Sequence, residues 1–202
     1  MSSEDIFLQT KFIKSVVSLN DMPEDSGSEI AFCGRSNSGK SSVLNVLSQN
    51  KKLAKISKTP GRTQTINIYS VNPNLKKRII DLPGYGYAKV SKKLRSKWGR
   101  EINQYLNSRN SLKGLIIVMD IRHPFQESDL SLIYWSREML MPIKILLNKA
   151  DKISKAQVQK NLKKGKNTIK ELIVGGQVQS FSSKDLRGLE ELKETLLNWF
   201  KN

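Results

Sequence analysis

The stretch best suited to chemistry is a glycine-rich loop between an apolar run and a helical pattern. It fits the phosphate-binding pattern Gly-x4-Gly-Lys-[Ser/Thr] and reads Gly34-Arg35-Ser36-Asn37-Ser38-Gly39-Lys40-Ser41-Ser42. The glycines permit a tight turn whose backbone N–H groups converge on phosphate oxygens, and the helix N-terminus adds positive potential. Lys40 is expected to bridge the terminal phosphates, and Ser41 to offer its hydroxyl to Mg²⁺. The loop therefore predicts a nucleotide site with magnesium.

Two further segments concern magnesium and the γ-phosphate. The first, Asp81-Leu82-Pro83-Gly84, ends an expected strand; its aspartate could hold magnesium through water, and the N–H of Gly84 could sense a γ-phosphate. The second is the polar loop Thr59-Pro60-Gly61-Arg62-Thr63-Gln64-Thr65. A threonine hydroxyl there could complete the Mg²⁺ shell and withdraw when the γ-phosphate leaves. Taken by itself, the loop is more typical of an ordinary turn.

Base recognition is expected at the segment Asn148-Lys149-Ala150-Asp151, which follows the apolar run Ile143–Leu147. The Asp151 carboxylate can accept both the N1–H and the exocyclic amine of guanine, whereas adenine has an acceptor at N1 and lacks that amine. Ser182-Ser183-Lys184 follows the last expected strand. By its position, it could bring a backbone amide to the guanine O6 and lay the Lys184 stem on the base. The expected ligand is GTP or GDP.

These segments must be positioned by alternating strands and helices. The expected strands are 29–33, 65–71, 78–81, 115–120, 143–148 and 177–182, and the expected helices are 41–48, 92–107, 128–140, 154–174 and 189–200. Gly175-Gly176 is expected to cap the fourth helix. Such alternation predicts an α/β fold: a doubly wound, mainly parallel six-stranded sheet with helices on both faces and ligands at the carboxyl ends of the strands. Residues 28–202 would form this domain, and 1–27 an N-terminal extension with a possible short strand at 12–17.

Composition limits the class of protein. The 202 residues have 38% hydrophobic and 26% charged content, which is typical of one globular domain. The net charge of +17 favours a polyanion such as RNA or an anionic membrane, without choosing between them. The chain shows no membrane-spanning run, secretory signal or lipidation motif, so we expect a cytoplasmic protein with no membrane partner. Cys33 is the only cysteine, which excludes an intramolecular disulfide and indicates a core thiol.

Basic residues gather in two places that could contact phosphates or form solvated helix faces. The first group follows the Asp81 motif and comprises Lys89, Lys92, Lys93, Arg95, Lys97 and Arg100. Trp98 within it is assigned to the core rather than to base stacking. The second group comprises Lys160, Lys163, Lys164 and Lys166. The first group is the preferred RNA contact because it adjoins a segment expected to move with nucleotide state.

Together these motifs resemble the translation-factor-like GTPases and, within them, the EngB family (also called YihA or YsxC) of ribosome-biogenesis GTP-binding proteins. The most family-specific stretches are Pro60–Gln64 and Asp81–Ala88, supported by Lys14–Ser18, Asp120–Pro124 and Asn148–Asp151. The resemblance implies GTP hydrolysis with Mg²⁺ held by Ser41 and Thr63, a role in maturing the large ribosomal subunit, and a link to cell division and septation. One departure is Asn148, where the family often has threonine and the wider GTPases have asparagine.

The catalytic groups are less clear than the binding groups. In Ras-like enzymes a glutamine after Asp-x-x-Gly orients the attacking water, but here that position is Tyr85, a poor water positioner. His123, the only histidine, lies in an expected turn and suits a structural or partner-contact role. The candidate catalytic groups are therefore Lys40, Thr63 and the N–H of Gly84, acting with Mg²⁺ by electrostatic stabilisation. Because Tyr85 replaces the water-positioning glutamine, we expect slow hydrolysis in isolation. Asn37 could hold K⁺ beside the phosphates, where the cation would stimulate hydrolysis.

Three functions remain open at this point. The first is a hydrolysing switch on a ribosomal large subunit precursor or its rRNA, which the intact phosphate and magnesium motifs favour. The second is a nucleotide-regulated RNA-binding module in which hydrolysis is incidental, and the third is a division-associated scaffold. A monomer is expected in each case. Sedimentation with GTP, GDP and a non-hydrolysable analogue would separate the first two.

Overall fold

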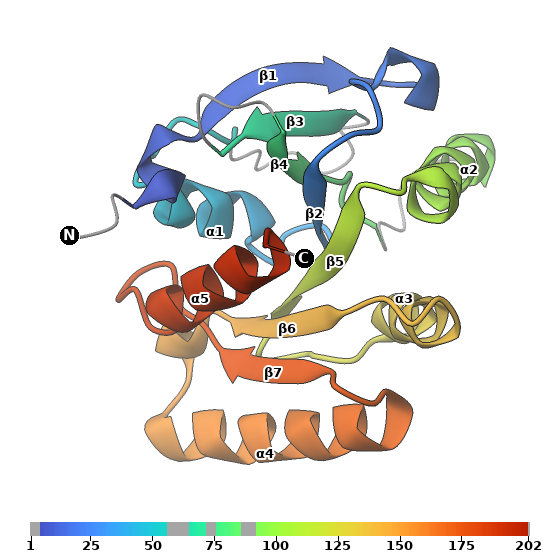
Figure 1. Cartoon of the computed structure of the whole chain (residues 1–202). Helices are drawn as coiled ribbons and strands as arrows, with labels where there is room; N and C mark the ends of the chain where they lie inside the picture. The colour runs from blue at the N-terminus through green and yellow to red at the C-terminus, as the bar shows by residue number, and fades with distance from the viewer. Residues whose placement is uncertain (1–4, 56–64, 72–75, 86–91, 202) are drawn as a thin grey trace.

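Seven strands form one sheet in the order β1-β3-β4-β2-β5-β6-β7 (Figure 1). The computed structural model describes residues 5–55, 65–71, 76–85 and 92–201, with the backbone alone for 92–99. The strands are β1 (Lys11–Val16), β2 (Ser28–Gly34), β3 (Ile66–Ser70), β4 (Lys77–Asp81), β5 (Leu112–Asp120), β6 (Ile143–Asn148) and β7 (Gln177–Ser180). Neighbouring strands from β4 through β7 pair in parallel, whereas β3 is antiparallel to both β4 and β1. The expectation of a doubly wound, mainly parallel sheet is confirmed.

The expected count of six strands is wrong by one. The seventh is β1, which lies in the N-terminal segment and pairs with β3 from Lys11↔Ser70 to Val16↔Ile66. Most of its side chains are exposed, as is common at the edge of a sheet. The short strand considered at 12–17 is thus present. The local pattern does not reveal its place in the sheet, because the pairing joins segments 50 residues or more apart in the chain.

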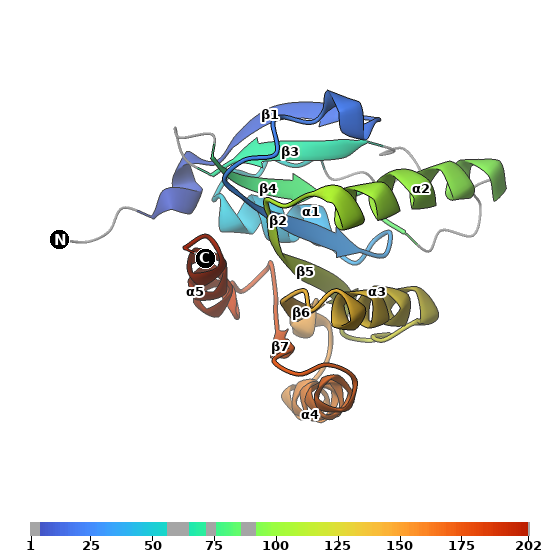
Figure 2. The same cartoon turned by 45° about the vertical axis from the view of Figure 1, so that its right-hand side comes forward.

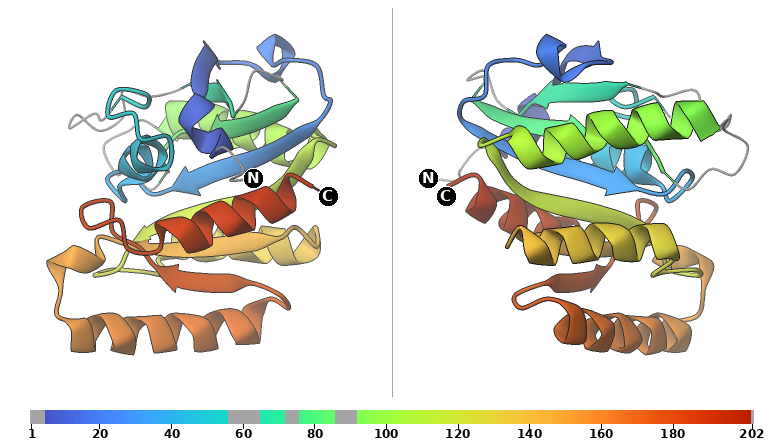
Figure 3. Two further views of the ribbon diagram at one scale, coloured as in Figure 1. Left: turned by 60° about the vertical axis from the view of Figure 1, so that its left-hand side comes forward. Right: turned by 90° about the vertical axis from the view of Figure 1, so that its right-hand side faces the viewer.

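In the described part of the chain five α-helices cover the sheet: α1 (Lys40–Leu47), α2 (Lys92–Ser108), α3 (Glu127–Glu138), α4 (Lys155–Leu172) and α5 (Leu189–Trp199). The views in Figures 2 and 3 place α1 and α5 on one face, α2 and α3 on the other, and α4 beside β7. Single 3-10 turns lie at Ile6–Gln9, Leu19–Asp21 and Ala150–Lys152. Every helix overlaps its expected range.

The end of α4 differs from the expected glycine cap. Its C-cap is Ile173, with extended backbone and an N–H donated to the carbonyl of Ile169. Gly175, with a φ of +77°, comes two residues later. Ile173 is buried, so the chain leaves the helix where this side chain enters the core, before the glycines are reached.

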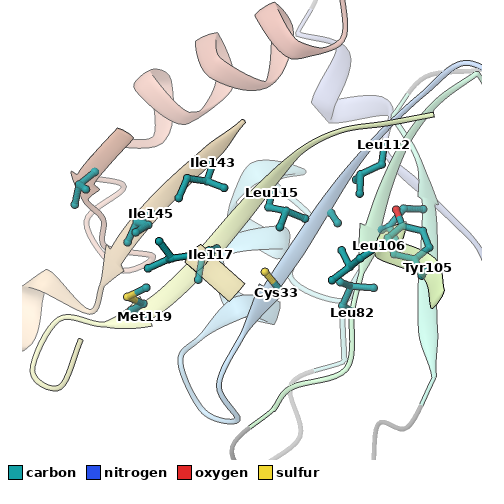
Figure 4. Packing of buried hydrophobic residues seen from close by; sticks show 14 of the residues in the cluster. Cys33, Leu82, Tyr105, Leu106, Leu112, Leu115, Ile117, Met119, Ile143 and Ile145 are labelled. Atoms are coloured by element: carbon teal, nitrogen blue, oxygen red, sulfur yellow. The ribbon is translucent and has the colours of Figure 1, made fainter. Parts of the chain in front are cut away.

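The core consists of two apolar clusters, one on each face of the sheet. Figure 4 shows part of the first, where Leu115 and Ile117 of β5 lie near Ile143 and Ile145 of β6. Parallel strands covered by helices on both faces are apolar along their length, which explains the uninterrupted runs in the sequence. Cys33 belongs to the same cluster, and burial raises the pKa of its thiol to about 12. It is a core thiol, as expected.

A buried ion-pair cluster ties the N-terminal segment to the amino ends of the strands. Glu29 is 0% exposed and accepts hydrogen bonds from Arg78 Nε at 3.0 Å, Arg109 Nη2 at 2.6 Å and Tyr105 OH at 3.1 Å. Asp25 accepts the backbone N–H groups of the two residues after Arg109, both at 2.9 Å. The opposite, carboxyl edge of the sheet is thus free of this structural cluster. Among the described helices, none has both the length and the apolar composition for crossing a bilayer.

Candidate nucleotide-binding site

The motif residues meet at the carboxyl edge of the sheet. The register pairs Phe32 of β2 with Asp81 of β4, and Asp120 of β5 with Asn148 of β6. Because these strands are parallel, the loops that follow them emerge at the same edge. The loop 35–39, the segment 82–85, the segment 149–151 and the residues after β7 therefore line one region, as expected for an open α/β sheet.

The loop between β2 and α1 is shaped to hold an anion. Gly39 is the N-cap of α1 with a φ of +94°, and no side chain caps the helix, so its first backbone N–H groups are left for a ligand. A Cβ on Gly39 would lie 2.3 Å from Asn148 Nδ2, and one on Gly34 would lie 2.4 Å from the Val118 carbonyl. The Ser38 hydroxyl is buried without a hydrogen-bond partner among the described residues. A tight loop, an uncapped helix and an orphaned hydroxyl together fit a phosphate group.

The charged pair of the site is Lys40 and Asp81. Lys40 Nζ forms an ion pair with Asp81 Oδ1, and Asn67 Nδ2 donates to the other carboxylate oxygen at 3.2 Å. Both side chains are largely buried, at 11% and 5% exposed, and buried charges need compensation. Phosphate oxygens and a cation would compensate Lys40 and Asp81 separately. In the described part of the chain no three His, Cys, Asp or Glu side chains gather to hold a metal, so magnesium there would need phosphate oxygens beside Asp81 and the half-buried Ser41.

The segment after Asp81 runs along the loop. Leu82 donates its N–H to the carbonyl of Phe32 at 3.0 Å. Tyr85 then exchanges two backbone hydrogen bonds with the loop: its N–H donates to the Gly34 carbonyl at 3.3 Å, and its carbonyl accepts the Ser36 N–H at 2.9 Å. Gly84, which precedes this bridge, is consequently held beside the phosphate loop.

The Tyr85 side chain is directed to α3. Its hydroxyl donates to Asp129 Oδ1 at 2.9 Å, and the second oxygen of Asp129 accepts the Gln126 N–H at 3.0 Å. Burial above all raises the pKa of Tyr85, with Cys33 and Asp129 adding to the effect, so the hydroxyl stays protonated. Burial also raises the pKa of Asp129, against the opposing effect of the hydrogen bond from Tyr85. The hydroxyl is engaged by a structural carboxylate, which agrees with its dismissal as a water positioner.

Asn148 and Lys149 brace the phosphate loop. Asn148 Nδ2 donates to the Ser38 carbonyl at 2.9 Å, while Lys149 Nζ donates to the Asn37 carbonyl at 2.6 Å and to Asp120 Oδ2 at 2.9 Å. Burial would raise the pKa of Asp120, but hydrogen bonds from Arg122 and Lys149 outweigh it and hold that pKa well below its usual range. The loop and the base motif are thus one connected unit. Sequence reasoning did not assign Asp120 a role, although its place at the end of the long strand β5 was a signal.

The proposed base-reading side chain, Asp151, lies next to Ser182. Ser182 Oγ donates to Asp151 Oδ1 at 3.1 Å and accepts the Lys184 N–H at 3.2 Å. Ala150 donates its N–H to the carbonyl of the residue before Ser182, at 3.0 Å. Only 13% of the Asp151 side chain is exposed, and the Ser183 hydroxyl is buried without a partner among the described residues. The two segments that the sequence assigned to the base are therefore joined in space.

The remaining candidates divide into placed and unplaced residues. Arg35 is half-buried, and its Nε lacks a hydrogen-bond partner within the described chain. Thr65 donates its hydroxyl to Asn67 Oδ1 at 3.3 Å, Ser42 is half-buried and Pro83 is buried. His123 is exposed in a turn after β5. Outside the described residues lie Gly61, Arg62, Thr63, Gln64 and Lys89, and the same holds for the side chains of Lys92, Lys93, Arg95, Lys97 and Trp98.

The fold and this edge of the sheet define a P-loop GTPase domain. Residues 29–149, more than half of the chain, match the family model described as "50S ribosome-binding GTPase". The chain is 45% identical over 194 residues to the probable GTP-binding protein EngB of Aeromonas hydrophila, covering 96% of this chain and 89% of that protein. It is 44% identical over 200 residues to the EngB protein of Coxiella burnetii, covering 99% and 97%.

A crystal structure of a probable GTP-binding protein engB aligns with a TM-score of 0.66, covering 86% of this chain and 99% of that one. Its sequence identity is 22%, so this likeness speaks for the fold alone. The relatives and the family model give the assignment: the chain belongs to the EngB family of GTP-binding proteins. The resemblance noted in the sequence is confirmed.

Proposed function

We propose that this protein is a Mg²⁺-dependent GTPase that hydrolyses GTP to GDP and phosphate and acts as a switch in assembly of the large ribosomal subunit. In this proposal it is a cytoplasmic monomer needed for normal cell division and septation, with residues 28–202 as the GTPase domain and 1–27 as an extension packed on it. The family model's description, which names 50S ribosome binding, supports the ribosomal partner. So does the net charge of +17, since rRNA is a polyanion.

The buried Lys40–Asp81 pair at the edge of the sheet is the observation that carries the hydrolytic assignment. Lys40 would bind the terminal phosphates, and Ser41 with Asp81 and Thr63 would hold Mg²⁺. Bound Mg²⁺ would supply positive charge at the phosphate oxygens as the bond to the leaving group breaks. The N–H of Gly84 would bind the γ-phosphate, because the Tyr85 bridge holds Gly84 beside the loop.

Guanine selection is assigned to Asp151. The carboxylate is largely shielded from water, accepts a hydrogen bond from Ser182 and forms an ion pair with Lys152 at 3.4 Å. A base that fails to donate two hydrogen bonds would therefore forgo two charge-assisted contacts with this carboxylate. Lys149 links the base segment to Asn37 of the phosphate loop. This arrangement couples the fit of the base to the geometry around the phosphates.

Slow hydrolysis in isolation follows from the position of Tyr85. Its hydroxyl is engaged by Asp129, and among the described residues we assign no other side chain to the attacking water. The missing stabilisation would come from a ribosomal partner or from K⁺ held near Asn37, an exposed residue of the loop with a φ of +65°. Either would add positive charge where negative charge develops.

The engagement of Tyr85 by Asp129 also supports a second candidate function. If no group positions water, the protein could serve as a nucleotide-regulated RNA-binding module in which hydrolysis is incidental. The test is to sediment the protein with purified large ribosomal subunits in GTP, GDP and a non-hydrolysable analogue while measuring phosphate release. The switch requires binding in GTP and in the analogue, weak binding in GDP, and release that follows hydrolysis. Equal binding in all three would replace the switch by the module.

A further inference from the structure

The helix α4 has an unusual charge composition. Its 18 residues contain six lysines and a single acidic residue, Glu171. All six lysines are exposed, and none forms an ion pair with a described residue. The helices α3 and α5 contain three acidic residues each and one basic residue each. The helix α2 has five basic residues and one acidic one, but four of those five side chains lie outside the described residues. The positive charge is therefore concentrated on α2 and α4, and of these two helices α4 is the one whose lysines the structure places.

This composition costs the helix stability. Lys155 in the first turn and Glu171 in the last turn oppose the helix macrodipole, whereas Lys170 in the last turn is favourable to it. Lys160 and Lys164, like Lys166 and Lys170, are like charges at i,i+4, and such pairs destabilise a helix by about 0.2–0.5 kcal/mol each. When a helix keeps charges that lower its own stability and no nearby contact offsets the cost, those charges are expected to serve a function.

Four of the lysines share one flank of α4. Val158, Gly165 and Ile169 are buried and mark the face against the core. At about 100° per residue, Lys155, Lys163, Lys166 and Lys170 lie roughly 60–140° from that face, in one stripe. From Lys155 to Lys170 the stripe rises by 15 residue steps, or about 22 Å at roughly 1.5 Å per residue. Figures 1 and 3 show α4 along the β7 side of the molecule with no other element over its outer side.

The side chains of this stripe indicate which partner it fits. No large exposed apolar residue belongs to α4, whereas membrane-surface helices present Trp, Phe or Leu to the lipid. Protein interfaces are depleted in lysine and enriched in arginine and aromatic residues, and α4 has neither arginine nor an aromatic residue. Bidentate reading of base edges also favours arginine, asparagine or glutamine. Lysine alone, repeated along a stripe, suits the phosphates of a nucleic-acid backbone.

We infer that the lysine stripe of α4 (Lys155, Lys163, Lys166 and Lys170) binds the phosphate backbone of RNA without reading its sequence. The inference deepens the proposed function and rests on it, because the ribosomal particle would supply the RNA. It places the contact on a helix that follows directly after the base-reading segment. The charge along α4 would then orient the protein on the ribosomal particle. The dependence of particle affinity on GTP or GDP would come from other parts of the domain.

The test compares two triple variants of the full chain. Lys163→Gln/Lys166→Gln/Lys170→Gln removes three charges of the stripe at nearly constant helix propensity. Lys51→Gln/Lys52→Gln/Lys55→Gln removes three charges from exposed lysines of the loop after α1 and is the matched control. Binding to a fluorescent RNA duplex, and sedimentation with large ribosomal subunits, are measured from 50 to 300 mM KCl (roughly the range over which counterion release is resolved). GDP affinity and the urea midpoint serve as folding checks.

The stripe variant is expected to bind RNA at least about tenfold more weakly at 0.1 M salt, with a log–log salt slope shallower by about 2–3, at roughly 0.7–0.9 per lost lysine contact. The control should keep the wild-type slope, and two RNA duplexes of different sequence should behave alike. Equal loss in both variants would overturn the inference, because the charge would then act globally. The inference would also be overturned if the stripe variant lost binding to phosphatidylserine vesicles or to poly-glutamate while its RNA binding equalled that of wild type.

The proposed function and the inference about α4 would be overturned by different results. If wild type does not sediment with large subunits in any nucleotide state, the proposed function is wrong, and the inference falls with it. If wild type sediments with GTP and the stripe variant does so with the same affinity and slope, only the inference is overturned. The urea midpoint of the stripe variant should equal or exceed that of wild type. A weaker RNA affinity then cannot be the result of misfolding.

Discussion

Replacing Tyr85 by phenylalanine separates a structural role for this side chain from a catalytic one. The change removes the hydroxyl that donates to Asp129 Oδ1 at 2.9 Å and leaves the ring in place. Asp129 is 1% exposed, so its carboxylate would keep only the Gln126 N–H as a donor. A lost hydrogen bond to a buried charged group costs about 2 kcal/mol. At an m-value of roughly 2 kcal/mol/M, the urea midpoint should fall by about 1 M.

The loss should depend on pH in a defined direction. In wild type the hydrogen bond from Tyr85 favours the charged form of Asp129 and opposes the rise in its pKa caused by burial. Without it the folded-state pKa of Asp129 rises further above the unfolded value. A carboxylate with a raised folded pKa loses stability as pH increases through that pKa. The difference between wild type and Tyr85→Phe should therefore be small near pH 4 and largest at neutral pH.

The assay combines urea unfolding at several pH values with GTP turnover at saturating substrate. The GTPase kcat should stay within about threefold of wild type, because the hydroxyl is directed to α3 and the backbone bridge to the loop remains. Tyr134→Phe is the matched control, since Tyr134 lies on α3 with its side chain exposed. A kcat reduced by about a hundredfold with an unchanged urea midpoint would refute the reasoning and make the hydroxyl a water-positioning group.

Three other predictions test the site and its surroundings. Asp151→Asn should weaken GDP binding by roughly 10⁴-fold or more and favour xanthosine diphosphate, because an amide donates where the carboxylate accepts; titration with both nucleotides checks this, and wild-type binding of ATP with GTP-like affinity would contradict it. GTP turnover with large ribosomal subunits should be faster in K⁺ than in Na⁺ if Asn37 helps to hold the cation; equal rates would remove that role. Asp25→Ala should destabilise the protein at pH 7 by about 1 kcal/mol after allowance for solvent screening. Burial would raise the pKa of Asp25, but the hydrogen bonds from Ser111 and Asn110 and the charge of Arg109 outweigh it and lower the pKa to about 2. This stability is present above the unfolded pKa of about 4 and is lost as pH falls to about 2, so chemical denaturation of both proteins should converge at low pH.

Much of the fold was predictable because its strands and helices are encoded locally. The strand β6 was expected at 143–148 and lies at Ile143–Asn148, since an uninterrupted apolar run bounded by polar residues fits a buried parallel strand. The end of α4 was misjudged, because the burial of Ile173 is a property of the assembled core. Gly175 and Gly176 are the stronger local signal for a helix end, and they therefore predicted a cap that the helix does not use.

The class of chemistry could be predicted from the motifs of the sequence. The order of the phosphate loop, Asp81 and Asp151 along the chain, with each at the end of an expected strand, was enough to expect a GTPase, because parallel strands bring such ends to one edge. Motifs of this kind depend on neighbours in sequence: a glycine at the helix start, a lysine after it, a carboxylate after an apolar run.

How these groups are held depends on long-range contacts that appear in the folded chain. The pairing of Tyr85 with Asp129, the bonds from Lys149 to Asn37 and Asp120, and the edge position of β1 join residues 29 to 112 positions apart. Their partners are chosen by the packing of helices on the sheet and by strand register. Neither is specified by local pattern, because many polar residues along the chain could make the same hydrogen bonds and only the folded arrangement brings particular ones within reach.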